Sequence, residues 1–252
     1  MINTTNEDNG SPEMKSPFLS KLENFWYYYK WHSIVALFLI FCILICSLQF
    51  CARKTYDVHV IYAGSKSIVR TSEDGDVPPY NRLSSALTER AEDYNEDGET
   101  LLTLYTLAFL SPAEREEVSK NPDLQVNEAL LEQDREFFMQ NFIYGSGGNY
   151  NVAFISPYVY EEYNTVSGVS MFQPVSDYLD SDYDGYELYS DFAVKLSSTP
   201  LYKNSATVRT ILPEDTLIVL KIRSFSASAT DRAGAEARYA ASEAFFRSLL
   251  AE

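Results

Sequence analysis

The sequence contains few of the residues that build nucleophilic or metal-dependent active sites. It has two His and three Cys in 252 residues. The three Cys all lie in or beside one apolar segment, so the rest of the chain has no thiol for a disulfide framework. His32 and His59 stand apart from any Cys or G-x-S-x-G motif, which disfavours a Ser–His or Cys–His nucleophile. We therefore expect the protein not to be an enzyme, while a pair of carboxylates of the glycosidase type stays open.

Basic residues are also scarce. The chain has 20 Lys and Arg against 36 Asp and Glu, a formal net charge of −16. Phosphate backbones bind basic surfaces, so nucleic acid is excluded as a general partner. Apolar residues make up 46% and charged residues 22%, which also excludes wholesale disorder and a fibrous repeat.

One apolar segment stands out from this average composition. Residues 33–50, SIVALFLIFCILICSLQF, contain no charged residue. As a helix they would be roughly 27 Å long, close to the thickness of a bilayer core. A helix buried in a soluble core would show a polar stripe, and here every face is apolar. The aromatic run FWYYYKW before the segment suits the headgroup layer. We predict a transmembrane helix with an interfacial segment over residues 25–51, which contacts the lipid bilayer.

The span divides the chain into three regions. Residues 1–24 are polar and are expected to form a flexible cytoplasmic tail. Residues 55–252 contain no Cys, carry a net charge of −17 and are long enough for one sizeable core. Basic residues flank the span on both sides almost equally, so the positive-inside rule gives little guidance. The acidity of the large domain and its calcium-like loops favour a single-pass signal anchor in the cell membrane, with the N-terminus cytoplasmic and residues 55–252 extracellular.

Within residues 55–252, strand and helix patterns alternate. This order predicts the α/β class: one N-terminal transmembrane helix followed by one α/β sandwich domain with a mostly parallel or mixed central sheet. The run 101–110, LLTLYTLAFL, is nearly all apolar and is expected to be a strand covered on both faces. A capping box at residues 111–114 starts a further helix. The expected strands are 57–63, 101–110, 150–156, 192–196 and 216–222, and the longer expected helices are 79–94, 127–142 and 232–250.

Two acidic loops have the spacing of calcium-binding loops. In the first, DYNEDGE, Asp93, Asn95 and Asp97 take positions one, three and five, a Gly takes position six, and Glu99 supplies the seventh. Calcium loops need oxygens at this spacing because the ion takes six to eight of them around a tight turn. Position twelve is Leu104 rather than a carboxylate, so a complete EF-hand is absent.

The second loop, DSDYDGYE, places Asp180, Asp182 and Asp184 at positions one, three and five, with Asp191 at position twelve. We predict calcium as the ligand of both loops, since weak sites fill readily where calcium is plentiful outside the cell. The alternative for each loop is a solvated acidic turn, because Asp, Asn and Gly dominate turns in any case.

Longer stretches resemble known families. The segment FWYYYKWHSIVALFLIF, followed by a strand, a helix and a D-x-N-x-D-G turn, resembles a family of uncharacterised, membrane-anchored proteins of Gram-positive bacteria. The later stretch NEALLEQDREFFMQNFIYGSGGNYNVAFISPYVYEEY, with FQPVSDYL after it, is similar to one lobe of type-II extracellular solute-binding proteins. The first resemblance implies no particular activity. The second implies that the ectodomain corresponds to one lobe, which is about half of a solute-binding protein.

Ligands of open α/β sheets gather beyond the carboxyl ends of the strands. This rule selects residues 64–67 and 156–158 as the loops that would face a ligand. We expect a non-enzymatic binding or accessory role at the cell surface. One alternative is a capture module that passes a sugar or a peptide to a membrane transporter. Another is a structural subunit of a membrane complex, which would require a membrane protein partner.

Overall fold

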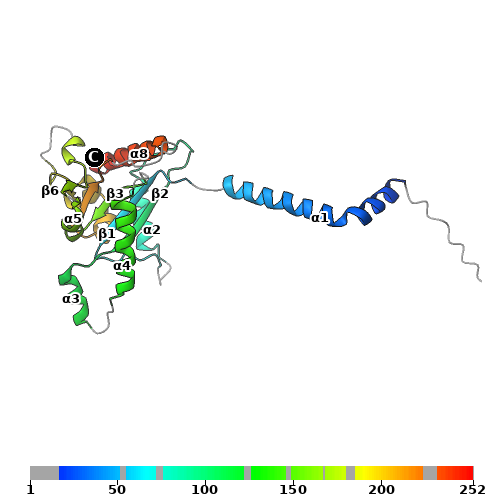
Figure 1. The fold of residues 1–252 in the computed structure, drawn as a ribbon. Coiled ribbons are helices and arrows are strands. Elements are labelled where there is room, and N and C mark those ends of the chain that lie inside the picture. The colour runs from blue at the N-terminus through cyan, green and yellow to red at the C-terminus, as the bar shows by residue number, and fades with distance from the viewer. Residues whose placement is uncertain are drawn as a thin grey trace, which may run out of the picture. The chain divides into compact units, whose positions relative to one another are not determined.

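A computed structural model describes residues 17–51, 55–71, 76–121, 126–145, 149–166, 168–179, 185–223 and 232–251. The chain divides into two compact units, Met1–Lys54 and Thr55–Glu252 (Figure 1).

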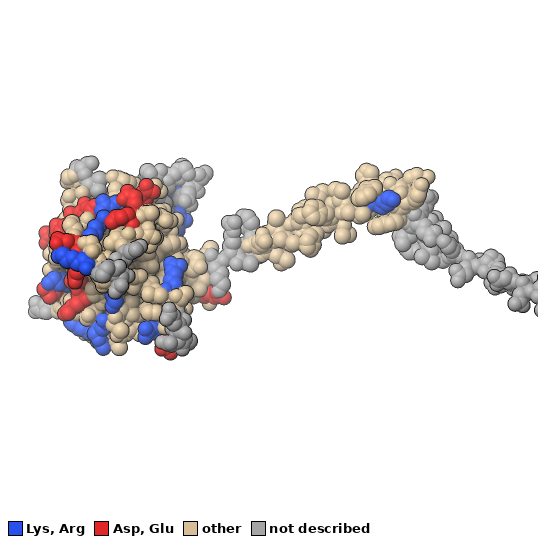
Figure 2. Space-filling model, turned by 90° about the horizontal axis from the view of Figure 1, so that it is seen from below, with Lys and Arg blue, Asp and Glu red and all other residues tan. Residues whose placement is uncertain are grey.

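The first unit contains the helix α1 (Pro17–Cys51). It begins inside the segment that was expected to be a tail. Within its stretch Phe25–Gln49, the most hydrophobic window has a mean hydropathy of 2.5, and none of that window is buried inside the protein. Among the described side chains of this stretch, Lys30 carries the one charge, and the described part of the helix is otherwise tan on the face that Figure 2 shows. The protein therefore has an N-terminal helix that is long and apolar enough to cross a membrane.

The second unit is built on a mixed six-stranded sheet with the strand order β2-β1-β3-β8-β7-β6. The first three strands in this order run parallel, and β8, β7 and β6 add to them in antiparallel fashion. The predicted α/β class with a mixed sheet is confirmed. The strands of this sheet are β1 (Val58–Gly64), β2 (Leu102–Ala108), β3 (Tyr150–Ile155), β6 (Leu188–Ser190), β7 (Ala193–Lys195) and β8 (Leu217–Leu220), and a separate hairpin pairs β4 (Thr165–Val166) with β5 (Val169–Ser170).

The helices of this unit begin at well-formed caps. Ser111 and Glu114 form the predicted capping box, in which Glu114 accepts from Ser111 N–H at 2.7 Å. The side chains of Ser156, Thr199 and Ser205 cap three shorter helices. The helices are α2 (Pro79–Thr88), α3 (Pro112–Lys120), α4 (Glu128–Phe137) with its π-helical continuation η1 (Phe138–Ile143), α5 (Pro157–Tyr163), α6 (Pro200–Asn204), α7 (Ala206–Ile211) and α8 (Arg232–Leu250), and two 3-10 turns are η2 (Val175–Asp177) and η3 (Leu196–Ser198).

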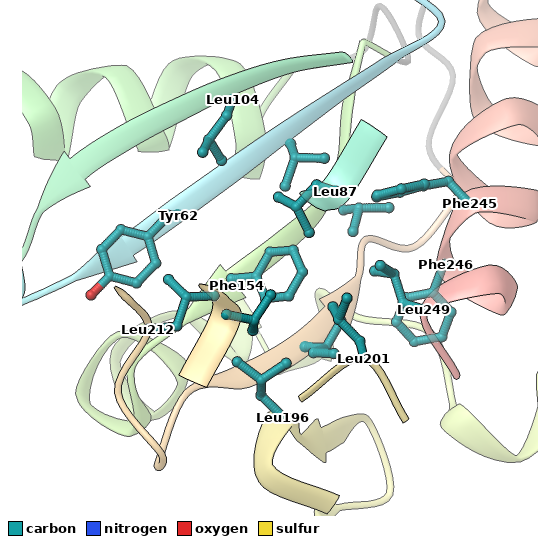
Figure 3. Close-up of a cluster of buried hydrophobic side chains, with 14 of the residues drawn as sticks. Tyr62, Leu87, Leu104, Phe154, Leu196, Leu201, Leu212, Phe245, Phe246 and Leu249 are labelled. Atoms are coloured by element: carbon teal, nitrogen blue, oxygen red, sulfur yellow. The ribbon is translucent and has the colours of Figure 1, made fainter. Parts of the chain in front are cut away.

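Buried side chains form one cluster on each face of the sheet. Successive residues of β1 point to opposite faces, so Val60 joins the first cluster and Ile61 the second. The first cluster packs the sheet against α2, α6, α7 and α8, and Figure 3 shows Phe154 of β3 among Leu201, Phe245 and other labelled side chains. The second cluster packs it against α4, η1 and α5. These two layers fix the strand ends on which the candidate site depends.

One expectation differs from the structure. The helix predicted over residues 79–94 ends at Thr88, because the chain turns there into the acidic loop. The strand β2 was expected to be covered on both faces, and this is confirmed. Leu104 of β2 belongs to the first cluster, which includes side chains of α2, and Leu107 belongs to the second, which packs against α4. The strand nevertheless lies at the edge of the sheet, and Thr103, Tyr105 and Thr106 are only half-buried.

Candidate functional site

The carboxyl ends of the parallel strands form the candidate site. The strand β2, which follows β1 in the chain, lies on one side of β1. The strand β3 lies on the other side of β1, and β8, β7 and β6 continue the sheet in that direction. In an open α/β sheet this reversal leaves a crevice in which ligands bind. Two hydrogen bonds hold the strand ends together, from Ser156 N–H to Ala63 O and from Phe109 N–H to Gly64 O, each 2.9 Å long. Two cavities open at this edge of the sheet, one beside the end of β3 and one beside the ends of β1 and β2.

The first cavity, here called the polar pocket, has a volume of about 400 Å³. It forms where α5 begins after β3, where β7 ends and where β8 begins, because the antiparallel strands bring these points to the same edge of the sheet. Its volume suits a small solute. The pocket is lined by Pro157, Glu187, Tyr189, Lys195, Ser197, Glu214 and Asp215.

Acidic groups dominate the polar pocket. The amine of Lys195 contacts the carboxylate of Glu187, so that this cation is already paired. Glu214 and Asp215 add two further carboxylates to the lining. The phenol of Tyr189 donates to Glu161 Oε1 at 2.9 Å, and burial together with this bond raises the pKa of Tyr189. A lining of this kind accepts hydrogen bonds from hydroxyl or amine groups and repels anions.

The second cavity, here called the β2 groove, has a volume of about 330 Å³ and lies along the end of the edge strand. Asp134 Oδ2 accepts from Ala108 N–H at 2.7 Å, and burial raises the pKa of Asp134. The Lys66 amine donates to Thr210 O at 2.8 Å, and the Arg70 guanidinium lies 4.4 Å from the centre of the Tyr80 ring. The groove is lined by Lys66, Ser67, Ile68, Val69, Arg70, Thr106, Leu107, Ala108, Leu130 and Asp134.

The loops selected from the sequence lie at these cavities. Lys66 and Ser67, from the loop after β1, line the β2 groove. Pro157, from the loop after β3, lines the polar pocket. Residues of both selected loops thus line cavities, and ligand binding by them stays a prediction. Sequence reasoning missed Glu187, Lys195, Glu214 and Asp215, because these residues come from separate segments that only the topology of the sheet brings together.

The first acidic loop is closed by its own hydrogen bonds. Asp97 N–H lies 3.2 Å from Asp93 Oδ1 and 2.9 Å from Asn95 Oδ1, so these two side-chain oxygens converge on one donor. Gly98 N–H donates to Asp93 Oδ2 at 2.7 Å, and Glu99 N–H donates to Asp97 Oδ1 at 3.0 Å. The turn requires positive φ at Glu96 (58°) and Gly98 (87°), which explains why a glycine occupies position 98.

The second acidic loop lies largely outside the described residues, since Asp180, Asp182 and Asp184 belong to a segment that the structure does not describe. Asp191 is described, and its backbone carbonyl accepts from Val175 N–H at 2.8 Å. Within the described ranges, no set of three His, Cys, Asp or Glu side chains is arranged to hold a metal ion. Calcium binding by either loop stays a prediction.

One buried and one half-buried polar residue lie towards the opposite, amino edge of β1 and β3. Lys221, directly after β8, is 3% exposed, and its amine donates to Gly145 O. Burial lowers the pKa of Lys221 to about 8. Burial and the charge of Arg238 lower the pKa of His59, whose ring lies at tilted angles among those of Tyr56, Tyr105 and Tyr150. Neither residue lines one of the cavities at the carboxyl edge.

No protein family, curated protein or solved structure matches the chain.

Proposed function

We propose that the protein is a single-pass, membrane-anchored protein whose α/β domain binds a partner or ligand outside the cell without catalysing a reaction. The observation that carries the proposal is the helix α1, in which residues 33–49 contain no charged side chain and the most hydrophobic window is not buried inside the protein. Such a surface is unfavourable in water and matches a bilayer core. The domain that follows has its own core on both faces of a sheet.

The anchoring can be tested with two charged substitutions in α1. Replacing Phe38 and Ile45 by Lys places two charges near the centre of the span. Each costs about 3 kcal/mol of membrane insertion. We expect the wild-type chain to stay with membranes after carbonate extraction and the double variant to become extractable. A matched control replaces the exposed Tyr144 and Val169 of the domain by Lys, and we expect that variant to stay in the membrane.

The ligand of the domain is proposed to be a small solute rich in hydroxyl or amine groups, such as a sugar or a short peptide. This alternative is supported by the polar pocket, whose position at the carboxyl edge and whose acidic lining both suit such a molecule. In this role the protein would deliver the solute to a membrane transporter. The structural-subunit alternative places the main partner in the membrane, against α1.

A ligand screen separates these alternatives. The full chain in detergent is heated with a panel of monosaccharides, disaccharides, dipeptides and tripeptides at millimolar concentration. Binding to the folded state at 100 times the dissociation constant adds about 2.7 kcal/mol of stability. Asp215→Asn should abolish such a shift, and Glu132→Gln on the exposed face of α4 should keep it. Absence of any shift in the wild type would remove solute capture and leave a membrane partner.

Calcium enters the proposal as a stabiliser of the first acidic loop. The support is that Asp93 and Asn95 direct their side-chain oxygens at the same backbone N–H of Asp97. Bound calcium would draw on these oxygens and on Asp97.

A further inference from the structure

We propose that the outer edge of β2 and the β2 groove bind a short, extended peptide that carries an apolar side chain next to a carboxylate. This site is separate from the polar pocket and does not depend on the solute proposed above. The peptide would add a strand to the sheet along residues 106–108, with its apolar side chain in the groove and its carboxylate near Lys66 and Arg70.

The backbone of β2 offers hydrogen-bonding groups to such a peptide. Phe109, directly after β2, donates its N–H to Gly64 O of β1. The odd-numbered residues of β2 therefore direct their backbone N–H and C=O groups at β1. The even-numbered residues then turn their N–H and C=O groups to the open side. Two of these groups are taken, Leu104 O by the Tyr80 hydroxyl at 2.9 Å and Ala108 N–H by Asp134. Both backbone groups of Thr106 and the carbonyl of Ala108 face the groove with no partner among the described residues.

Exposed aliphatic side chains gather at the same place. Val69 is 48% exposed and Leu130 is 47% exposed, and both line the groove. Val77 is 59% exposed and lies three residues before Tyr80, whose N–H donates to Val69 O at 3.1 Å. Apolar side chains beside an unpaired strand edge are usually shielded in a monomer, since they invite pairing with another chain. Here they would hold an apolar side chain of the peptide.

The charges of the groove select an acidic occupant. Residues 55–252 carry a net charge of −17, yet two cations, Lys66 and Arg70, line this cavity. The single carboxyl group in the lining, Asp134, has one oxygen engaged by Ala108 N–H, and burial raises its pKa. Arg70 is held in place over Tyr80, so its guanidinium is positioned to meet a carboxylate.

The length of the open edge favours a short peptide over a second copy of this chain. Pairing β2 with β2 of another copy would need the whole strand edge. The Tyr80 hydroxyl occupies Leu104 O in the first half of the strand, which leaves residues 106–108. Three backbone groups suffice for a brief strand addition by a peptide and are few for an edge-to-edge dimer.

The test selects linear octapeptides from a random displayed library on the full chain in nanodiscs. We expect enriched peptides with an apolar residue beside Asp or Glu, and binding weakened by at least about tenfold when that acid is changed to Lys. Thr106→Pro removes an outward N–H and leaves the ladder to β1 intact. It should keep the melting temperature and lose peptide binding. Thr103→Pro, which removes an N–H directed at β1, should lower the melting temperature instead.

Two further variants keep the test independent of any proline effect on folding. Arg70→Gln should weaken the enriched acidic peptides by about tenfold. Val69→Asp should also weaken them, while Val169→Asp, equally a change of an exposed valine but on the β4–β5 hairpin, should not. No enrichment, enrichment of basic peptides, or binding unchanged in Thr106→Pro would overturn the proposal. A dimer in sedimentation that Thr106→Pro dissociates would also overturn it, because a second copy would then occupy the edge.

Discussion

Asp57 Oδ2 accepts a hydrogen bond of 2.8 Å from Leu101 N–H. The other oxygen of the same carboxylate accepts from Tyr94 N–H at 2.9 Å and from Asn95 N–H at 3.1 Å. Asp57 is 5% exposed and lies directly before β1. One buried carboxylate therefore fixes both ends of the acidic loop to the start of the domain, close to where the chain emerges from the N-terminal unit in sequence.

Loss of this carboxylate should destabilise the domain. In Asp57→Asn, an amide NH₂ replaces one oxygen and confronts a backbone donor, so at least one hydrogen bond is lost in a buried site. We expect a loss of about 2 kcal/mol, which is roughly 4–8 °C in the melting temperature of a domain of this size. Thermal melts followed by circular dichroism measure the change. Asp76→Asn, at an exposed aspartate, is the control and should melt like the wild type. Equal melting of both variants would mean that Asp57 does not hold the loop.

Calcium should stabilise the chain if the first acidic loop binds it. A site filled at 100 times its dissociation constant adds about 2.7 kcal/mol. We expect the melting temperature to rise by several degrees from EDTA to millimolar calcium, and we expect Asp93→Ala to remove the rise. Magnesium at the same concentration is the control, since it keeps its waters and prefers smaller octahedral sites. Identical melts in EDTA and calcium would make the loop an acidic turn closed by its own backbone.

The stability of the domain should rise with pH between about 8 and 10. Burial lowers the pKa of Lys221 to about 8 from the ordinary 10.5, so in this interval the unfolded chain holds more protons than the folded one. Folding then becomes more favourable as the pH rises. Lys221→Met removes the buried amine and should flatten this rise, with a gain at pH 7 of up to about 3 kcal/mol. Denaturant unfolding at each pH gives the free energies, and an unchanged slope in the variant would contradict the role of Lys221.

Above pH 10 the trend should reverse. Burial raises the pKa of Tyr62, Tyr163 and Tyr239 above the ordinary value of 10.0. The unfolded chain then loses protons from these phenols before the folded chain does, which favours unfolding as the pH rises further. Tyr62→Phe should reduce the loss of folding stability above pH 10 and should leave the rise in stability between pH 8 and 10 in place. If Tyr62→Phe lost as much stability above pH 10 as the wild type, the Tyr62 phenol would be excluded as a source of the effect.

Much of the fold follows from local patterns in the sequence. The apolar runs of β1, β3 and β8, the capping box at Ser111 and the helix α8 are visible because each pattern is complete within one segment. The helices α5 and α6 have only seven and five residues, too few for a periodic stripe, although Ser156-Pro157 and Thr199-Pro200 are helix-start signals. The edge position of β2 could not be predicted, because strand order depends on packing between distant segments.

The candidate site was less predictable than the fold. The loops at Lys66 and Pro157 could be selected because they follow predicted parallel strands. The opposite wall of the polar pocket comes from β6, β7 and the turn before β8, whose antiparallel addition has no local signal. Asp57 was missed because a single Asp before a strand is common, and its three hydrogen bonds come from residues 94–101.

The most direct test of the central proposal is protease digestion of intact cells that produce the full chain, with tags on both termini. We expect added protease to degrade the C-terminal tag and residues 55–252, to spare the N-terminal tag, and to leave α1 in the membrane fraction. Lysed cells, in which both tags should be lost, are the control. Protection of the C-terminal tag in intact cells, or release of the undigested chain from membranes by carbonate, would contradict a membrane-anchored extracellular domain.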